Sequence, residues 1–595
     1  MSETVRFKQK RWDLSDVLPT SSGPEFDATL KELYSDVDQF ELLREKLNSF
    51  SKDDMVKALQ LYERIERLTS RPVCYASLRL SEDTQAQESR VLENKMGELK
   101  SDVTNKMLFF RLWWMSLDES RAQELMPENG DWKRFLTQLR KDKPYMLDEN
   151  VEQAIAIKDG TGMSAWTNFY SQLTNKFTYV VRVDGQTLKD EGGSRTRRFT
   201  RGDLISLIMG VDPKEREAAY RSLLRTYAEH GDELGEIYRT IVRDWRNEHI
   251  NLRHHKSPIA VMNVVNDIPD EAIDALLSVC RENTSVFQDF FRKKAGLLGM
   301  SKMSRYHIYA PLQPKDRTIP YSDAVEFVLD AFDSFDRGFG KLARRVFEQD
   351  HVDAEIRQGK EFGAFCSNVA PDIVPYLQLN YAGKTLDVVT IGHESGHAVH
   401  TQMASRHSPL TYLPSIPMAE TASVFGEMLL FDRMVEQERD PQVKRDLLVA
   451  ELGNLYGTIQ RQAYFTLFEI DAHDSIGKHA TVDKLCELWS SNLKEQFGSA
   501  VTVPREFEWE WTTIPHIYGA PFYCYSYPFG TLLTLALYDQ YRNEGRSFVP
   551  KYLEILSAGG SESPARTLGR VGIDIKDPRF WQNGFNVIRD MVHKL

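Results

Sequence analysis

Two histidines and one glutamate occur at a spacing that suits a metal-dependent hydrolase. In residues 385–408, TLDVVTIGHESGHAVHTQMASRHS, His393 and His397 stand four positions apart and Glu394 directly follows the first. Residues four apart on an α-helix are separated by about 40° and about 6 Å, so both imidazoles can face one ion. Glu394 can then reach a water molecule beside that ion without binding the ion itself. This HExxH arrangement is typical of zinc hydrolases.

A third protein ligand must come from elsewhere, because a catalytic zinc ion has three protein ligands and one open position. His400 lies on the same helix face, but it is about 10 Å along the axis from His393, too far for both to bind one ion. The extended HExxHxxGxxH pattern is excluded because His400 and Met403 occupy its glycine and third-histidine positions. The better candidate is Glu420, which follows His397 by 23 residues.

Residues 417–432, PMAETASVFGEMLLFD, predict a second helix with Glu420 and Glu427 two turns apart on one face. A turn in PLTYLPSIP would return this helix antiparallel to the first. Glu420 would then bind the ion, and Glu427 would accept a hydrogen bond from a ligand imidazole. Asp387 lies at the predicted start of the first helix. It either orients a ligand histidine or is a plain helix-start acid, and the sequence leaves both roles open.

The elements around these motifs are predicted to be mostly helical. Apolar residues recur three and four positions apart in many long segments, of which 53–70, 213–245 and 441–470 are the clearest. Residues 176–189 predict a hairpin, because Asp184–Gly185 separates two alternating runs. Two short strands are expected at 361–369 and 375–381, just before the HExxH helix. We therefore expect a mainly helical fold with a small β-sheet beside the histidines.

The clearest break in the chain is KDEGGSRTRRFTRGD, residues 189–203. It combines two glycines with a dense basic cluster that includes Arg195, and runs of charge usually lie in water. We interpret it as a connection between an N-terminal helical domain, residues 1–195, and a catalytic domain, residues 196–595.

The composition excludes some classes of partner. The 595 residues carry a formal net charge of -12, which argues against general nucleic-acid binding because polyphosphate repels an acidic protein. The five cysteines are far apart and odd in number, as is typical of free thiols in a reducing compartment. There is no apolar signal segment at the N-terminus and no run of roughly 18 apolar residues. We expect a cytoplasmic protein without a membrane or nucleic-acid partner; its oligomeric state is not indicated.

The sequence resembles the M3 metallopeptidases, and within them the oligoendopeptidase F group, over essentially the whole chain. The HExGHxxH element with the downstream glutamate is the most specific part of this resemblance. The other segments that carry it are RWDLSDVLP, YHIYAPL, KEFGAFCS, LNYAGKTLDVV, MAETASVFGE, PHIYGAPFYCYSYPFG and LSAGGSESPARTLGRVGIDIKDPRFW.

The resemblance implies one Zn²⁺ per chain, with His393, His397 and Glu420 as ligands and Glu394 as general base. It also implies a predominantly helical clamshell whose halves enclose a deep central channel, with the zinc on its floor. Finally, it implies that a histidine and tyrosines stabilise the transition state. In this chain these are His516 followed by the four tyrosines Tyr518, Tyr523, Tyr525 and Tyr527.

This chain departs from the family pattern by one extra residue between His516 and the tyrosines. The extra residue lies in a stretch that contains Pro521. The resemblance therefore does not settle which tyrosine acts, and Tyr525 and Tyr527 are the preferred candidates. The predicted function is zinc-dependent hydrolysis of internal peptide bonds in short to medium oligopeptides. Two alternatives stay open at this point: a zinc carboxypeptidase or dipeptidase on a similar helical scaffold, and a catalytically inactive helical binding protein.

Overall fold

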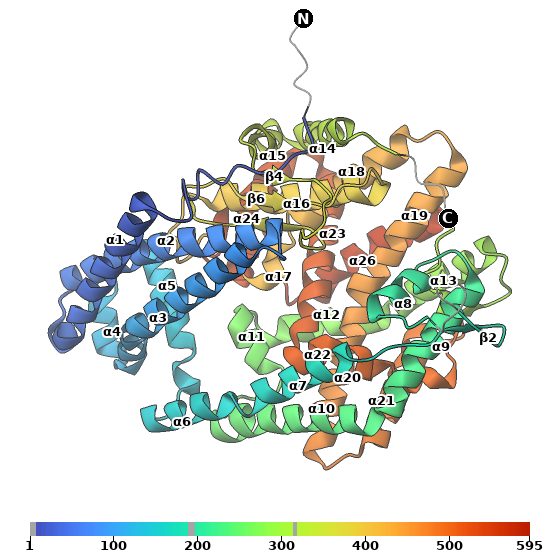
Figure 1. Cartoon of the computed structure of the whole chain (residues 1–595), viewed down its shortest axis with the longest axis horizontal. Coiled ribbons are helices and arrows are strands. Elements are labelled where there is room, and N and C mark those ends of the chain that lie inside the picture. The colour runs from blue at the N-terminus through green and yellow to red at the C-terminus, as the bar shows by residue number, and fades with distance from the viewer. Residues whose placement is uncertain (1–6, 189–196, 313–317) are drawn as a thin grey trace, which may run out of the picture. The chain divides into compact units, whose positions relative to one another are not determined.

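The computed structural model describes residues 7–188, 197–312 and 318–595 (Figure 1). The chain divides into two compact units, each built from three segments. Unit 1 comprises residues 1–143, 316–434 and 540–573, and unit 2 comprises residues 144–315, 435–539 and 574–595. The expected boundary at residue 195 lies outside the described residues. The division into 1–195 and 196–595 stays a prediction.

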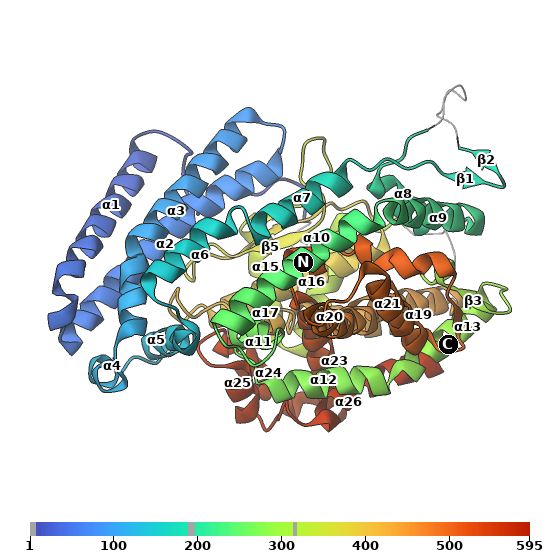
Figure 2. The same ribbon diagram turned by 90° about the horizontal axis from the view of Figure 1, so that it is seen from below.

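Unit 1 consists mainly of helices, and one of them covers residues 53–70, where the hydrophobic periodicity indicates a helix. The helices are α1 (Pro24–Glu41), α2 (Lys52–Glu82), α3 (Gln87–Ser116), α4 (Glu119–Leu125), α5 (Gly130–Lys141), α14 (Tyr321–Phe335), α15 (Arg337–Glu348), α16 (Thr385–Ala404), α17 (Ile416–Ala419), α18 (Ser423–Gln437, which runs on into unit 2), α24 (Val549–Ala558) and α25 (Pro564–Arg570). Helix α2 begins at a capping box, in which Ser51 and Asp54 each bond the backbone of the other. Helices α1, α2 and α3 lie side by side (Figure 2) around a core that includes the Phe40, Tyr62 and Phe110 rings.

A three-stranded sheet in unit 1 lies against α16. Its order is β4 (Val352–Asp353), β6 (Tyr376–Gln378) and β5 (Phe365–Ser367), with β4 parallel and β5 antiparallel to β6. Both β5 and β6 contact α16. The strands expected at 361–369 and 375–381 are thereby confirmed, and so is the small sheet beside the HExxH helix.

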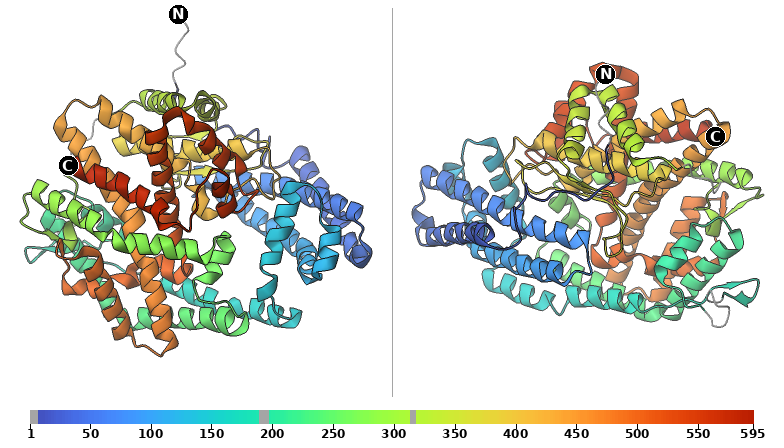
Figure 3. Two further views of the ribbon diagram at one scale, coloured as in Figure 1. Left: turned by 180° about the vertical axis from the view of Figure 1, so that it is seen from behind. Right: turned by 45° about the horizontal axis from the view of Figure 1, so that its top comes forward.

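Helix α16 is held by its neighbours in unit 1 as well as by the sheet. Helices α14 and α15 pair with each other, as Figure 3 shows in yellow-green, and both contact α16. Helix α24, which comes from the third segment of the unit, also packs against α16. The HExxH helix therefore lies inside a rigid set of elements, which is what a precise metal site requires.

Unit 2 is also mainly helical. Its helices are α6 (Glu149–Asp159), α7 (Met163–Asn175), α8 (Arg201–Ile208), α9 (Pro213–Glu229), α10 (Gly231–Trp245), α11 (Ala260–Asn266), α12 (Asp270–Glu282), α13 (Thr284–Leu297), α19 (Pro441–Leu455), α20 (Arg461–Gly477), α21 (Val482–Phe497), α22 (Pro515–Gly519), α23 (Ser526–Glu544, which runs on into unit 1) and α26 (Pro578–His593). Helix α20 packs against α10, α12 and α21.

The strands of unit 2 are short. The hairpin β1 (Arg182–Val183) and β2 (Gln186–Thr187) is antiparallel and turns at Asp184–Gly185, both with positive φ, which confirms the hairpin prediction. Strands β3 (Met303–Ser304) and β7 (Val501–Thr502) form a parallel pair. The mainly helical fold class is thus confirmed. Among the described residues, no helix combines the length and apolarity needed to cross a membrane.

Candidate metal centre

Helix α16 starts at Thr385, and Asp387 fixes this start. Its Oδ2 accepts hydrogen bonds from the backbone N–H groups of Ala382, at 2.8 Å, and Lys384, at 2.9 Å. A carboxylate in the first turn also interacts favourably with the helix dipole. These contacts support the helix-start role for Asp387, one of the two that the sequence leaves open.

His393 and His397 lie on one face of α16 and point toward the same place. Their Nε2 atoms are 3.2 Å apart, and both side chains are partly exposed, 27% and 22% respectively. The spacing of one helical turn therefore brings the two imidazoles together as the motif predicts.

Glu420 lies in a break between two helices. The prediction of one continuous helix over 417–432 is wrong here, because α17 ends at Ala419 and α18 begins at Ser423. The Oε2 atom of Glu420 is 3.5 Å from the Nε2 atoms of both His393 and His397. The Ser423 hydroxyl donates to this same Oε2 atom at 2.6 Å and fixes the carboxylate. The break thus turns the glutamate toward the histidines.

These three atoms have the separations that a tetrahedral ion requires. Nitrogen and oxygen ligands about 2.1 Å from zinc lie about 3.4 Å from each other in a tetrahedron. The three distances in the protein are 3.2, 3.5 and 3.5 Å. His393, His397 and Glu420 are also the one group of three or more histidine, cysteine or acidic side chains that could hold a metal ion in the described part of the chain. The residues present therefore fit a zinc ion.

Glycine allows α18 to approach α16 closely at this level. A Cβ atom at Gly396 would lie 2.5 Å from the carbonyl oxygen of Ala422 and 2.7 Å from Cα of Ser423. Gly392, one turn earlier on α16, lies against Leu430, which is later on α18. The two helices therefore run antiparallel, as the sequence predicts, and Gly396 sets the distance to the turn that carries Glu420.

The turn at Glu420 is also supported by α24. The Tyr552 hydroxyl donates a hydrogen bond to the carbonyl oxygen of Thr421 at 3.0 Å. Tyr552 is fully buried and packs on Phe425 with ring centroids 4.1 Å apart. The position of the third candidate ligand thus depends on a helix more than a hundred residues away in sequence.

Glu427 orients His393. Its Oε1 atom lies 2.5 Å from Nδ1 of His393 and accepts the proton on that nitrogen, which leaves the Nε2 lone pair for an ion. Burial lowers the pKa of His393, but the hydrogen bond and charge of Glu427, together with Glu420, outweigh it and raise the pKa to about 9. This is the carboxylate–histidine arrangement common at zinc sites.

Glu394 is the most buried acid of the site, with 6% of the residue exposed. Burial raises its pKa to about 7, His393 opposes this, and Glu420 and Glu427 add to it. A divalent cation would act in the opposite direction. Three carboxylates beside two imidazoles give the site an excess of negative charge, which favours a cation.

His400 takes no part in this group. It is buried, and burial lowers its pKa to about 4, with a smaller contribution from His397. It is absent from the possible metal ligands of the described residues, in agreement with its predicted distance along the helix. Its imidazole is therefore a neutral core side chain.

Replacing Glu427 with Ala is expected to weaken zinc binding by about 10- to 100-fold, because His393 loses the acceptor that fixes its ring. Titration with Zn²⁺ against a competing chelator measures the change. Glu436→Ala, at an exposed position of the same helix, is the matched control and should bind zinc like the parent. Parent-like affinity in Glu427→Ala would contradict an orienting role.

Replacing Gly396 with Ala is expected to weaken zinc binding by about tenfold or more, because the methyl group meets backbone atoms and displaces Glu420. Gly392→Ala is the matched control, since its Cβ would meet the movable end of Leu430 at 2.1 Å. The same chelator competition compares the two variants. Equal affinities in both would show that the close approach at Gly396 does not set the ligand distance.

A second group of predicted site residues lies in unit 2. The rings of His516, Tyr523 and Tyr527 face one another, with centroid separations of 5.4 to 6.4 Å. All three are partly exposed. Burial and the nearby Arg461 lower the pKa of His516, so its ring is neutral near pH 7 and has one N–H to donate.

Tyr525 and Tyr518 differ from this group because both are fully buried. The Tyr525 hydroxyl accepts a hydrogen bond from the Asn266 amide at 2.8 Å, and Tyr518 stacks on Tyr170 at 3.8 Å. The sequence favours Tyr525 over Tyr523, whereas the structure places Tyr523 beside His516. The signal for Tyr523 was its spacing of four from Tyr527, which places both rings on one side of a helical segment.

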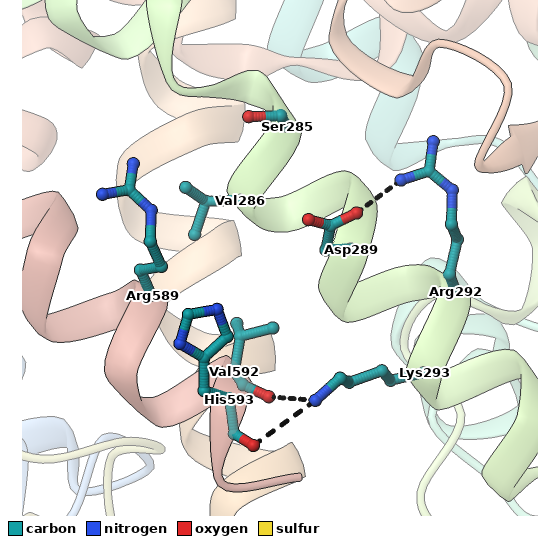
Figure 4. Close-up of a pocket in the computed structure, with 8 residues that line it drawn as sticks. All are labelled: Ser285, Val286, Asp289, Arg292, Lys293, Arg589, Val592 and His593. Carbon is teal, nitrogen blue, oxygen red and sulfur yellow. Dashed lines mark hydrogen bonds and ion pairs between the residues drawn. The ribbon is translucent and has the colours of Figure 1, made fainter.

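A pocket in unit 2 involves none of these residues (Figure 4). It lies between α13 and α26, where Lys293 donates to the carbonyl oxygen of Val592 at 2.7 Å and Arg292 pairs with Asp289 at 2.5 Å. The residues that line it are Ser285, Val286, Asp289, Arg292, Lys293, Arg589, Val592 and His593. Lys293 thus binds the C-terminal end of α26, and Arg292 binds an acid of its own helix. Because both basic side chains have structural partners, we assign this pocket no part in the proposed reaction.

Comparison with known proteins finds relatives along almost the whole chain. The chain is 25% identical over 577 residues to oligopeptidase PepF of Bacillus subtilis, covering 95% of this chain and 84% of that protein. A solved structure titled as a putative peptidase from Chlamydophila abortus matches with a TM-score of 0.86 at 22% identity, covering 100% of this chain and 98% of that one. The structure of oligoendopeptidase-F from Enterococcus faecium matches with a TM-score of 0.70 at 21% identity, covering 96% and 98%.

Family models match as well. A model described as oligopeptidase F matches residues 113–179, and the model of peptidase family M3 matches residues 209–587. The second match includes every candidate ligand and the candidate general base Glu394, and it spans more than half of the sequence. The chain therefore belongs to peptidase family M3, a family of metallopeptidases that hydrolyse oligopeptides.

Proposed function

We propose that this metallopeptidase holds one Zn²⁺ ion through His393, His397 and Glu420 and cleaves internal bonds of oligopeptides. The observation that carries the proposal is the convergence of three ligand atoms at tetrahedral separations directly beside Glu394. Two imidazoles and one carboxylate are a common ligand set for catalytic zinc, although cobalt and manganese accept similar ligands.

Glu394 acts as the general base. Bound zinc would polarise the scissile carbonyl and lower the pKa of a water molecule in the open position. Glu394 accepts the proton of the attacking water and later passes it to the nitrogen of the leaving amine. Burial raises the pKa of Glu394, which makes its carboxylate a stronger proton acceptor, and a bound cation would oppose this shift and keep the group ionised before the transfer.

His516, Tyr523 and Tyr527 are proposed to donate hydrogen bonds to the oxyanion that forms on the carbonyl. Neutral imidazole and phenol groups are suitable donors, and such donors are each worth about 100-fold or more in rate. Tyr525 is buried and its hydroxyl is bonded to Asn266, so we propose that Tyr525 holds the local structure. Tyr523 takes its place as the proposed donor.

Strand β5 is proposed to bind the substrate backbone. It is an edge strand of the sheet and contacts α16. Burial and the nearby Glu394 carboxylate raise the pKa of the Cys366 thiol, in the middle of β5, so this strand runs close to the proposed base. A peptide that pairs with such an edge is held by main-chain hydrogen bonds, which gives little selectivity for side chains.

We also propose that the protein works in the cytoplasm on peptides and has no nucleic-acid or membrane partner. The five free cysteines and the acidic net charge support this location. The matching relatives that are named oligopeptidases support a peptide substrate.

Mass spectrometry of products from a mixed peptide library, with and without a chelator, tests the function. We expect internal cleavage, including of peptides blocked at both termini, loss of cleavage on chelation and recovery on addition of Zn²⁺. Cleavage that requires a free terminus would favour the carboxypeptidase or dipeptidase alternative. Absence of any hydrolysis by the zinc-loaded protein would favour the inactive binding protein.

A further inference from the structure

The segment between α22 and α23 contains a strained residue. Phe522 has φ 62° and ψ 11°, a left-handed conformation that is uncommon for a bulky side chain without a compensating interaction. Its ring is fully buried. Tyr523 follows directly, and the segment joins His516 to the tyrosines that face it. Whatever holds Phe522 in this conformation also sets where those side chains lie.

Two hydrogen bonds hold this conformation: the Tyr523 N–H closes a turn on the carbonyl oxygen of Ala520 at 3.1 Å, and Glu469 binds Phe522 itself. Glu469 lies on α20 and is completely buried, and its Oε1 atom accepts a hydrogen bond from the backbone N–H of Phe522 at 2.8 Å. Burial raises the pKa of Glu469 to about 8, and the bond from Phe522 opposes this shift. The carboxyl group is therefore mostly protonated near pH 7 and acts as a neutral acceptor.

The surroundings of Glu469 make it a costly residue to bury. Its Oε2 atom, the hydroxyl of Tyr238 and both ring nitrogens of His473 have no hydrogen-bond partner among the described residues. The His473 ring packs on Phe522 with centroids 4.6 Å apart. A buried carboxyl group is stabilised by its hydrogen bonds, and the Phe522 N–H is the donor that the described residues give to Glu469. The bond to Phe522 is what the carboxyl group adds.

A second contact fixes the same segment a few residues later. The amide of Asn266, at the end of α11, donates to the Tyr525 hydroxyl at 2.8 Å. The segment is thus held on one side by Glu469 through Phe522 and on the other by Asn266 through Tyr525. Tyr523 lies between these two contacts and Tyr527 follows them.

We propose that Glu469 is a positioning residue for peptide hydrolysis: its bond to the Phe522 N–H maintains the left-handed turn that presents Tyr523 and Tyr527 beside His516. The inference rests on the proposed role of those two tyrosines in the reaction. Glu469 itself does not touch the reacting atoms. Its length and its acceptor oxygen matter, and its charge does not.

Three substitutions of Glu469 separate this role from others. Gln keeps an acceptor oxygen at the same reach and is neutral, so Glu469→Gln should keep kcat within about threefold of the parent. Asp keeps the acid but is one methylene shorter, and Met keeps the volume but has no strong acceptor. Both should lower kcat by roughly 10- to 100-fold, as expected when a donor is misplaced by about 1 Å. Zinc content should be unchanged in all three.

A double-mutant cycle shows whether Glu469 acts through the tyrosines. Tyr523→Phe/Tyr527→Phe should lower kcat by about 100-fold or more. In that background the further loss from Glu469→Asp should shrink to about threefold or less, because its effect passes through the removed hydroxyls. Circular dichroism and thermal melting verify that each variant is folded. If the Met variant does not fold, the comparison is made between Glu469→Gln and Glu469→Asp.

Several outcomes would overturn the inference. One is an order of activity in which Asp exceeds Gln, since that would assign the role to charge. Another is the same loss from Glu469→Asp with and without the tyrosine hydroxyls, which indicates a purely structural role. If the tyrosine double variant is impaired and Glu469→Asp is not, the inference fails and the proposed function stands. If the tyrosine double variant retains full activity, the proposed role of the tyrosines fails and the inference fails with it.

Discussion

Replacing Glu394 with Gln should lower kcat about a thousandfold while the zinc content stays at one ion per chain, because general base catalysis contributes 10²–10⁴ in rate. The amide cannot accept the proton of the attacking water, yet it matches the carboxylate in size. Since Glu394 is not among the three converging ligand atoms, the metal site should survive the change. Hydrolysis of an internally quenched peptide and elemental analysis of the same sample give both quantities.

Glu436→Gln is the matched control for this experiment, because Glu436 is exposed on α18. It should leave both quantities at the parent level. Substantial turnover by zinc-loaded Glu394→Gln would assign the base to another residue. Loss of zinc from Glu394→Gln would instead show that this carboxylate belongs to the ligand set.

Replacing Glu420 with Ala should reduce zinc affinity by more than about 100-fold, because removal of a supporting acceptor alone costs 10–100-fold. Two imidazoles would remain, and they are too few to hold a catalytic zinc ion tightly. Activity should fall in proportion to the bound metal and recover partly at high Zn²⁺ concentration. Competition with a chelator measures the affinity, and activity at a series of zinc concentrations tests the recovery.

Ser423→Ala provides a graded comparison with Glu420→Ala. It removes the donor at 2.6 Å from the Glu420 carboxylate but leaves the carboxylate in place. We expect a loss of affinity of about tenfold, well below that of Glu420→Ala. Parent-like zinc content in Glu420→Ala would show that the third ligand is another residue.

The local parts of the metal centre were predictable from the sequence. The helical period alone predicts that His393 and His397 lie on one face of the helix. The rise per residue excludes His400 as a ligand of the same ion. The need of a catalytic zinc ion for a third protein ligand points to Glu420 on the following segment. What could not be predicted is that the helix breaks at Glu420, because the break depends on tertiary contacts with Gly396 and with Tyr552.

The tyrosines show where a pattern in sequence becomes ambiguous. Tyr523, Tyr525 and Tyr527 alternate along the chain, and no local rule states which of them are buried. The structure separates them through Asn266, which lies more than 250 residues away, and through the left-handed turn at Phe522. The sequence also does not indicate which chain segments make up each of the two units, because this depends on which distant segments pack together.

The assembly of unit 1 from three separate stretches affects when the site can form during synthesis. Helix α16 and the turn at Glu420 are translated well before α24, yet α24 packs on that helix and its Tyr552 supports that turn. Domains complete their folding only when all their parts have left the ribosome. A nascent or truncated chain that ends before residue 549 therefore lacks these contacts to the candidate metal centre. Such a chain is expected to bind zinc more weakly than the full-length protein.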